Sequence, residues 1–169
     1  MKIGLFTDAY FPIISGVSIS VDTLAKELTK LGHTVFIVTN KHECAVQQDR
    51  VLRLGGYKIP MKGMHEYRIG KVTRKKVREI IELDLDIIHC HSEFTMGRLG
   101  RKAARKMKIP IVHTYHTMLE DYVHFISKLL RGPLRFASKK YSKSFANSSD
   151  YVIFPTIKVK RTFDRYGFT

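Results

Sequence analysis

The chain has 169 residues, the size of one domain, and its hydrophobic fraction of 44% is typical of a globular protein with a core. No run of about 18 apolar residues occurs, which excludes a transmembrane helix, and Asp8 comes too early for a secretory signal peptide. Cys44 and Cys90 are widely spaced, so we expect free thiols in a reducing cytoplasm. The 30 Lys and Arg against 15 Asp and Glu give a net charge of +15, a field that attracts nucleic acid, anionic lipid or phosphorylated substrates.

The hydrophobic pattern predicts strands that are separated by helices. Apolar and β-branched runs predict strands at 2–7, 34–39, 51–54, 86–90, 109–113 and 150–154. Helical periodicity predicts helices at 17–31, 72–83, 94–107, 119–130, 134–145 and 156–166, with the fourth and fifth split at Gly132-Pro133. This alternation implies right-handed crossovers and an α/β, Rossmann-like fold with a parallel sheet and helices on both faces. Residues 1–169 contain no internal linker, so we expect one domain.

Two loops at the ends of predicted strands are candidate ligand-binding sites, because ligands of open parallel sheets bind at that edge. The first loop contains Asp8 and Tyr10 and runs into Ser15-Gly16-Val17. Gly16 would allow a phosphate to approach the backbone at the N-terminus of the following helix. The chain has neither the dinucleotide-binding glycine motif nor a P-loop. The alternative for Gly16 is a purely structural turn.

The second group is made of histidines. His89 and His91 end one predicted strand, and His113 and His116 follow the next. Four imidazoles at one edge have the composition of a zinc site. Polar residues also commonly end a strand, and no acidic partner other than Glu93 is evident, so we expect no metal and no cofactor.

His116 lies beyond the end of its strand, where it can serve as a general base, a hydrogen-bond donor or a hydroxyl contact. The alternative is a turn histidine. Glu120 and Asp121 follow closely. They can orient a substrate or, equally, stabilise the N-terminus of the next helix.

A long basic stretch follows these acids. Residues 122–149 contain no Asp or Glu, and apolar and aromatic residues are interleaved with six bases: Lys128, Arg131, Arg135, Lys139, Lys140 and Lys143. A basic amphipathic helix of this kind favours an anionic membrane surface. The alternative is that the apolar residues pack on the sheet and the bases face water. A second acid-free stretch, 94–119, adds six more bases.

Five segments, taken in chain order, carry a resemblance to a known family: 2–12 with Ser15-Gly16-Val17, 24–28 with 32–35, 86–94, 113–117, and 149–156 with Lys158. Together they resemble the N-terminal, acceptor-binding domain of retaining glycosyltransferases of family four (group 1), which have the GT-B fold. Segments 91–94 and 114–124 are most similar to bacterial glucosyltransferases that act on diacylglycerol. That resemblance implies transfer of glucose from UDP-glucose to a lipid by an enzyme bound peripherally to the cytoplasmic face of an anionic membrane.

The resemblance also assigns residues. It implies that Ser15-Gly16-Val17 approach the donor diphosphate and that His116 is the catalytic histidine at the acceptor and the transferred sugar. In retaining members of this fold the leaving phosphate is itself a candidate base. We take the acceptor or cleft candidates to be Asp8, Tyr10, His91, Glu120 and Asp121. The family's C-terminal, nucleotide-sugar-binding domain is absent from residues 1–169, so we expect this fragment alone to be inactive.

Other readings stay open at this point. The acceptor could be another lipid, such as a phosphatidylinositol, or a soluble molecule, and the residues do not identify the donor sugar. A nucleic-acid-binding module would also use the charge of +15. Because no nucleic-acid motif occurs and the bases lie among apolar residues, we expect no nucleic-acid partner.

Overall fold

The computed structural model describes residues 1–59, 65–116 and 131–165. Glu120, Asp121 and Lys128, which the sequence singled out, lie outside these ranges. Both cysteines are free, Cys44 exposed and Cys90 buried.

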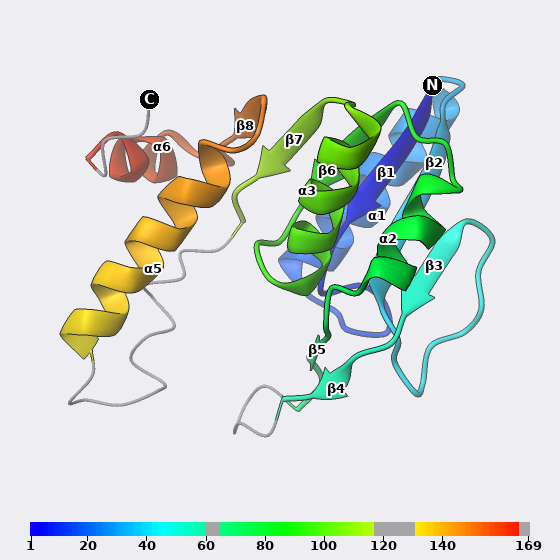
Figure 1. Ribbon diagram of the computed structural model, residues 1–169, viewed down its shortest axis with the longest axis horizontal. Helices are drawn as coiled ribbons and strands as arrows, with labels where there is room; N and C mark the ends of the chain where they lie inside the picture. The colour runs from blue at the N-terminus through cyan, green and yellow to red at the C-terminus, as the bar shows by residue number, and fades with distance from the viewer. Residues whose placement is uncertain (60–64, 117–130, 166–169) are drawn as a thin grey trace.

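A six-stranded parallel sheet forms the centre of the molecule (Figure 1). Its strands are β1 (Lys2–Phe6), β2 (Thr34–Asn40), β3 (Val51–Leu54), β6 (Ile87–Cys90), β7 (Ile111–Thr114) and β8 (Tyr151–Ile153). They lie in the order β3-β2-β1-β6-β7-β8, and every neighbouring pair is parallel. The predicted Rossmann-like fold is therefore confirmed, with every strand end within two residues of its predicted position.

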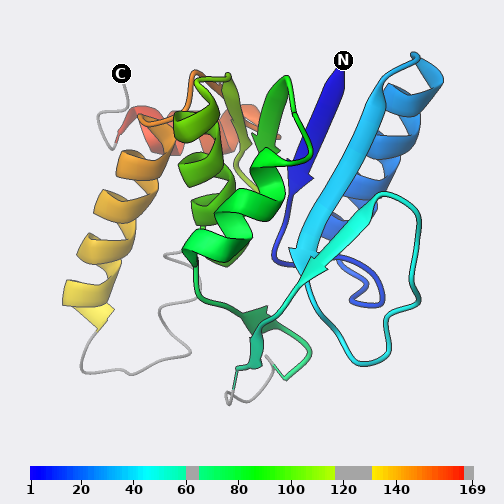
Figure 2. The same ribbon diagram turned by 45° about the vertical axis from the view of Figure 1, so that its right-hand side comes forward.

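Helices cover both faces of the sheet, because successive residues of a strand point to opposite faces. Ile3 and Leu5 of β1 belong to the apolar cluster beneath α1 (Gly16–Lys30). Phe6 belongs to the larger cluster beneath α2 (Arg74–Ile81) and α3 (Thr95–Met107). Figure 2 shows α1 behind the sheet and α2 and α3 in front of it. Each face thus has its own apolar core.

The C-terminal end of helix α5 (Arg131–Ala146) contacts α3, and α6 (Ile157–Asp164) follows β8. Phe145 of α5 is fully buried in the cluster beneath α3, and the Arg101 guanidinium of α3 lies 4.8 Å from the centre of its ring. The prediction that Gly132-Pro133 would precede the helix is wrong, because α5 begins at Arg131. Proline is tolerated in the first helical turn, where its missing N–H would have no intrahelical partner.

One small element was not predicted. β4 (Tyr57–Lys58) and β5 (Arg68–Ile69) form a two-stranded antiparallel sheet near the carboxyl ends of the main strands (Figure 1). The buried Arg68 organises it: Nη1 donates to three backbone carbonyls, and Nη2 donates to Glu43 Oε2 at 2.6 Å. Gly70 exchanges two hydrogen bonds with the Thr95 hydroxyl, which joins this sheet to the start of α3.

Candidate functional site

Three neighbouring strands end at one level, and the loops after them form the candidate site. The register pairs Phe6 of β1 with Cys90 of β6, and Cys90 with His113 of β7. The residues that follow therefore share the carboxyl edge of the sheet, where open parallel sheets bind ligands. This edge brings His91 and His116 into direct contact.

Asp8 is a buried carboxylate with both oxygens occupied. Ser92 Oγ donates to Oδ2 at 2.6 Å and Asn40 Nδ2 donates to Oδ1 at 2.9 Å. The backbone N–H of Met96 donates to both oxygens, at 3.2 and 3.3 Å, and so caps α3, whose own N-cap residue Phe94 makes no side-chain bond. Burial raises the pKa of Asp8, while these donors act in the opposite direction. Asp8 therefore joins the ends of β1, β2 and α3.

Tyr10 is also used inside the fold. Its ring is buried in the cluster beneath α1, and its hydroxyl donates to Asp22 Oδ1 of that helix at 2.9 Å. Burial and the Asp22 carboxylate both raise the pKa of Tyr10. Of the cleft candidates, Tyr10 thus positions α1 against the first loop.

The N-terminus of α1 leaves room for a ligand to approach the backbone closely. Ser15 and Ser18 form a reciprocal capping box, with bonds of 2.8 and 3.2 Å between each backbone N–H and the other's hydroxyl. Gly16 is exposed, and a Cβ added there would meet no atom of the described residues within 4 Å. Val17 is half-buried and packs on the cluster beneath the helix. The loop therefore has open space in front of the helix N-terminus, where an anion is stabilised.

The three histidines His89, His91 and His116 form a stack. The rings of His89 and His91 lie 4.1 Å apart, and those of His91 and His116 lie 5.3 Å apart at 26°. His91 Nδ1 and His116 Nε2 share a hydrogen bond of 3.0 Å, and His89 Nε2 shares one of 2.7 Å with the Thr114 hydroxyl. His89 and His91 are buried, and His116 at the end of the stack is half-buried.

Burial keeps these rings neutral. It lowers the pKa of His89 to about 4, and that of His91 well below its ordinary value. The pKa of His116 is also lowered, by burial and by the neighbouring His113. Among the described residues, no group of three or more His, Cys, Asp or Glu side chains is arranged to hold a metal ion.

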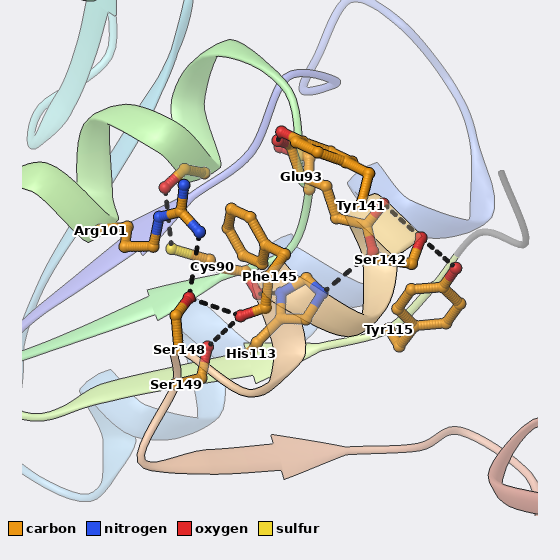
Figure 3. A network of polar contacts seen from close by, with 12 residues as sticks. Cys90, Glu93, Arg101, His113, Tyr115, Tyr141, Ser142, Phe145, Ser148 and Ser149 are labelled. Carbon is orange, nitrogen blue, oxygen red and sulfur yellow. Dashed lines mark hydrogen bonds and ion pairs between the residues drawn. The ribbon is translucent and has the colours of Figure 1, made fainter. Parts of the chain in front are cut away.

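The sequence did not reveal a second polar cluster, which is centred on His113 and Glu93 (Figure 3). His113 Nδ1 donates to the Cys90 carbonyl at 3.0 Å, so its Nε2 faces Glu93 Oε1 at 3.6 Å. Both side chains are buried, and burial raises the pKa of Glu93 against the opposing effect of His113. Ser142 of α5 donates to Glu93 Oε2 at 3.5 Å.

This cluster attaches α5 to the sheet edge. The Tyr115 hydroxyl donates to Ser142 Oγ at 3.0 Å, and the Tyr141 hydroxyl donates to the Glu93 carbonyl. The signal in the sequence was the spacing of Tyr141, Ser142 and Phe145, which places them on one face of a helix. That face turns inward, toward β6 and β7 (Figure 3).

The predicted membrane-contact residues divide into two groups. Lys140 is exposed, and Lys139 and Lys143 are half-buried on α5. Arg131 and Arg135 belong to the first part of α5, where the structure does not describe their side chains. The second acid-free stretch forms a surface cavity of about 450 Å³ on α3, lined by Val72, Arg98, Arg101, Lys102, Arg105 and Lys106. Among the described residues, no helix is long and apolar enough to cross a bilayer.

Comparison with known protein sequences gives three results. Residues 14–169 match the family Glycosyltransferase Family 4. The chain is 38% identical over 168 residues to Alpha-monoglucosyldiacylglycerol synthase of Acholeplasma laidlawii, a match that covers 94% of this chain and 42% of that protein. It is 41% identical over 170 residues to Alpha-monoglucosyldiacylglycerol synthase of Streptococcus pneumoniae (strain ATCC BAA-255 / R6), covering 98% of this chain and 38% of that protein.

Among solved structures, UDP-GlcNAc 2-epimerase from Methanocaldococcus jannaschii is similar, with a TM-score of 0.62 and 14% identity. The match covers 100% of this chain and 43% of that one, and at this identity it shows the fold alone. The chain spans about two fifths of the length of the two curated relatives.

Proposed function

The chain belongs to glycosyltransferase family 4, as its motifs predicted, and from that premise we propose that it is the acceptor-binding part of a lipid glucosyltransferase. The donor would be UDP-glucose and the acceptor a diacylglycerol-type membrane lipid. The observation that carries this proposal is the identity of 38% and 41%, over nearly the whole chain, to two proteins named Alpha-monoglucosyldiacylglycerol synthase.

The geometry supports a division of roles within the chain. His116 is half-buried at the carboxyl edge, where its ring can contact the transferred sugar or the acceptor hydroxyl. The open space in front of Gly16 can admit the donor diphosphate at the N-terminus of α1. We propose that the rest of the donor is held by a second domain outside residues 1–169, so that this chain alone has no transferase activity.

The basic surface supports attachment to an anionic membrane, on the cytoplasmic face. The described part of α5 contains no acidic residue, and its apolar side is anchored by Phe145 while Lys140 is exposed. Each base close to an anionic bilayer contributes about 1 kcal/mol, which is about fivefold in affinity. A net charge of +15 strengthens this attraction at low ionic strength.

Vesicle co-sedimentation tests the proposal. The chain should bind phosphatidylglycerol-rich vesicles, with little binding to phosphatidylcholine vesicles and weak competition by duplex DNA. Lys140→Glu on α5 should weaken binding at least fivefold. The matched control is Lys30→Glu on α1, a helix on the opposite face of the sheet, where Lys30 pairs with the exposed Glu27. Equal loss in both variants, or complete displacement by DNA, would refute the membrane-docked arrangement.

A further inference from the structure

The contact between His91 and His116 sets the state of the histidine that the proposed function places at the ligand. His91 Nδ1 and His116 Nε2 are 3.0 Å apart in a hydrogen bond. Both atoms are ring nitrogens, so one of them carries the hydrogen and the other accepts it. The two possible arrangements leave His116 with opposite chemistry at its other nitrogen, Nδ1.

His91 has one N–H to give, because it is neutral. It is 3% exposed, and burial together with the nearby His89, His116 and His113 lowers its pKa well below the ordinary value. Its Nε2 is buried and has no hydrogen-bond partner among the described residues. Glu93, a carboxylate of the same loop, is directed at His113 and Ser142 instead.

The unpartnered Nε2 decides between the arrangements. If His116 donated, the hydrogen of His91 would be on Nε2, as a buried N–H without an acceptor. In the backbone of native proteins, buried N–H groups without a partner are rarer than under-satisfied acceptors. The same preference in the ring places the hydrogen of His91 on Nδ1, from which it donates to His116 Nε2.

We propose that His91 is a positioning residue that holds His116 in the tautomer protonated at Nδ1, so that His116 offers a ligand an N–H donor. This inference rests on the proposed function only for the identity of the ligand. The oxygen that accepts this bond would belong to a sugar hydroxyl, the acceptor hydroxyl or the donor phosphate. Because Nε2 is already engaged by His91, His116 does not take up the proton of the acceptor.

His89 packs against His91 and helps to hold it in place. Its ring stacks on His91 at 4.1 Å, and its Nε2 is held by the Thr114 hydroxyl at 2.7 Å. One hydrogen bond thus joins β6 to β7, through His89 and Thr114, and the other joins the residues that follow these two strands, His91 and His116. Tautomers of this kind follow from the hydrogen-bond network, and nitrogen NMR observes them directly.

The test is a two-bond ¹H–¹⁵N spectrum of this chain with ¹⁵N-labelled histidine. In the unmodified chain, His91 and His116 should each show a protonated Nδ1 and an unprotonated Nε2. In the His91→Leu variant, His116 should become a mixture of tautomers. In the His91→Asp variant, the carboxylate at position 91 can only accept, so the hydrogen of His116 should move to its Nε2. His33→Leu, in the turn between α1 and β2, is the matched control and should leave His116 unchanged.

The unmodified chain alone can overturn the proposal, by showing His116 protonated at Nε2. An unchanged His116 tautomer in a folded His91→Leu variant would also overturn it. If a variant at position 91 fails to fold, the spectrum of the unmodified chain decides. The measurement needs no lipid or donor, so failure of the vesicle experiment and failure of this one are separate results.

Discussion

Removing the Asp8 carboxylate should destabilise the chain more than any other single aspartate change among the described residues. Asp8→Ala leaves the Met96 N–H at the start of α3 without an acceptor, which costs about 1–3 kcal/mol, and removes the bonds from Ser92 and Asn40. Asn40 Nδ2 keeps its hydrogen bond to the Arg68 carbonyl at 2.9 Å, and Ser92 is only half-buried. The loss of each of their bonds to Asp8 therefore costs about 1 kcal/mol. The total is about 4 kcal/mol.

Urea unfolding followed by circular dichroism measures this loss, and a thermal scan should show a midpoint about 8–16 °C lower. Asp8→Asn keeps one acceptor oxygen and should lose less than Asp8→Ala. Asp49→Ala is the matched control, because that side chain is 92% exposed and its contact with Arg50 is worth little. A loss below about 1 kcal/mol for Asp8→Ala, similar to the control, would refute the role of Asp8 as the cap of α3.

Two further predictions concern packing and pH. A Cβ at Gly97 would lie 1.8 Å from the Ser92 carbonyl oxygen, so Gly97→Ala should cost about 3 kcal/mol in urea unfolding. Gly132→Ala in α5, where an added Cβ meets nothing within 4 Å among the described atoms, should instead be neutral or stabilising by up to about 1 kcal/mol, and a similar effect in both variants would contradict this. For His89, the folded-state pKa of about 4 lies below the ordinary 6.5, so the unfolded chain binds more protons in this interval and stability falls as the pH falls from 6.5 to 4. His89 therefore contributes about 3 kcal/mol to the loss of unfolding free energy between pH 6.5 and 4. In unfolding curves measured across that range, His89→Gln should remove most of this pH dependence. An unchanged pH dependence would count against the buried neutral ring.

The sheet and its functional edge could be predicted because their causes are local in the sequence. Short apolar runs such as Ile3 to Phe6 are buried on both faces of a parallel sheet, and turn residues mark where each run stops. Since parallel strands end at the same edge, His91 and His116 could be expected there from the sequence alone. The sheet of β4 and β5 could not, because its two-residue strands have no periodicity and depend on one arginine, Arg68.

By itself, then, the sequence determined the fold class, the family, the basic character of α5 and the edge at which to look for a site. Only the tertiary structure decided which polar groups at that edge are occupied. The partners of Asp8 are 32, 84 and 88 residues away, and those of His91 and Glu93 are 25 and 49 residues away. A polar side chain is free for a ligand only if the fold has not already given it a partner, and burial sets its charge. Both depend on which distant segments pack together, and no local pattern in the chain records that.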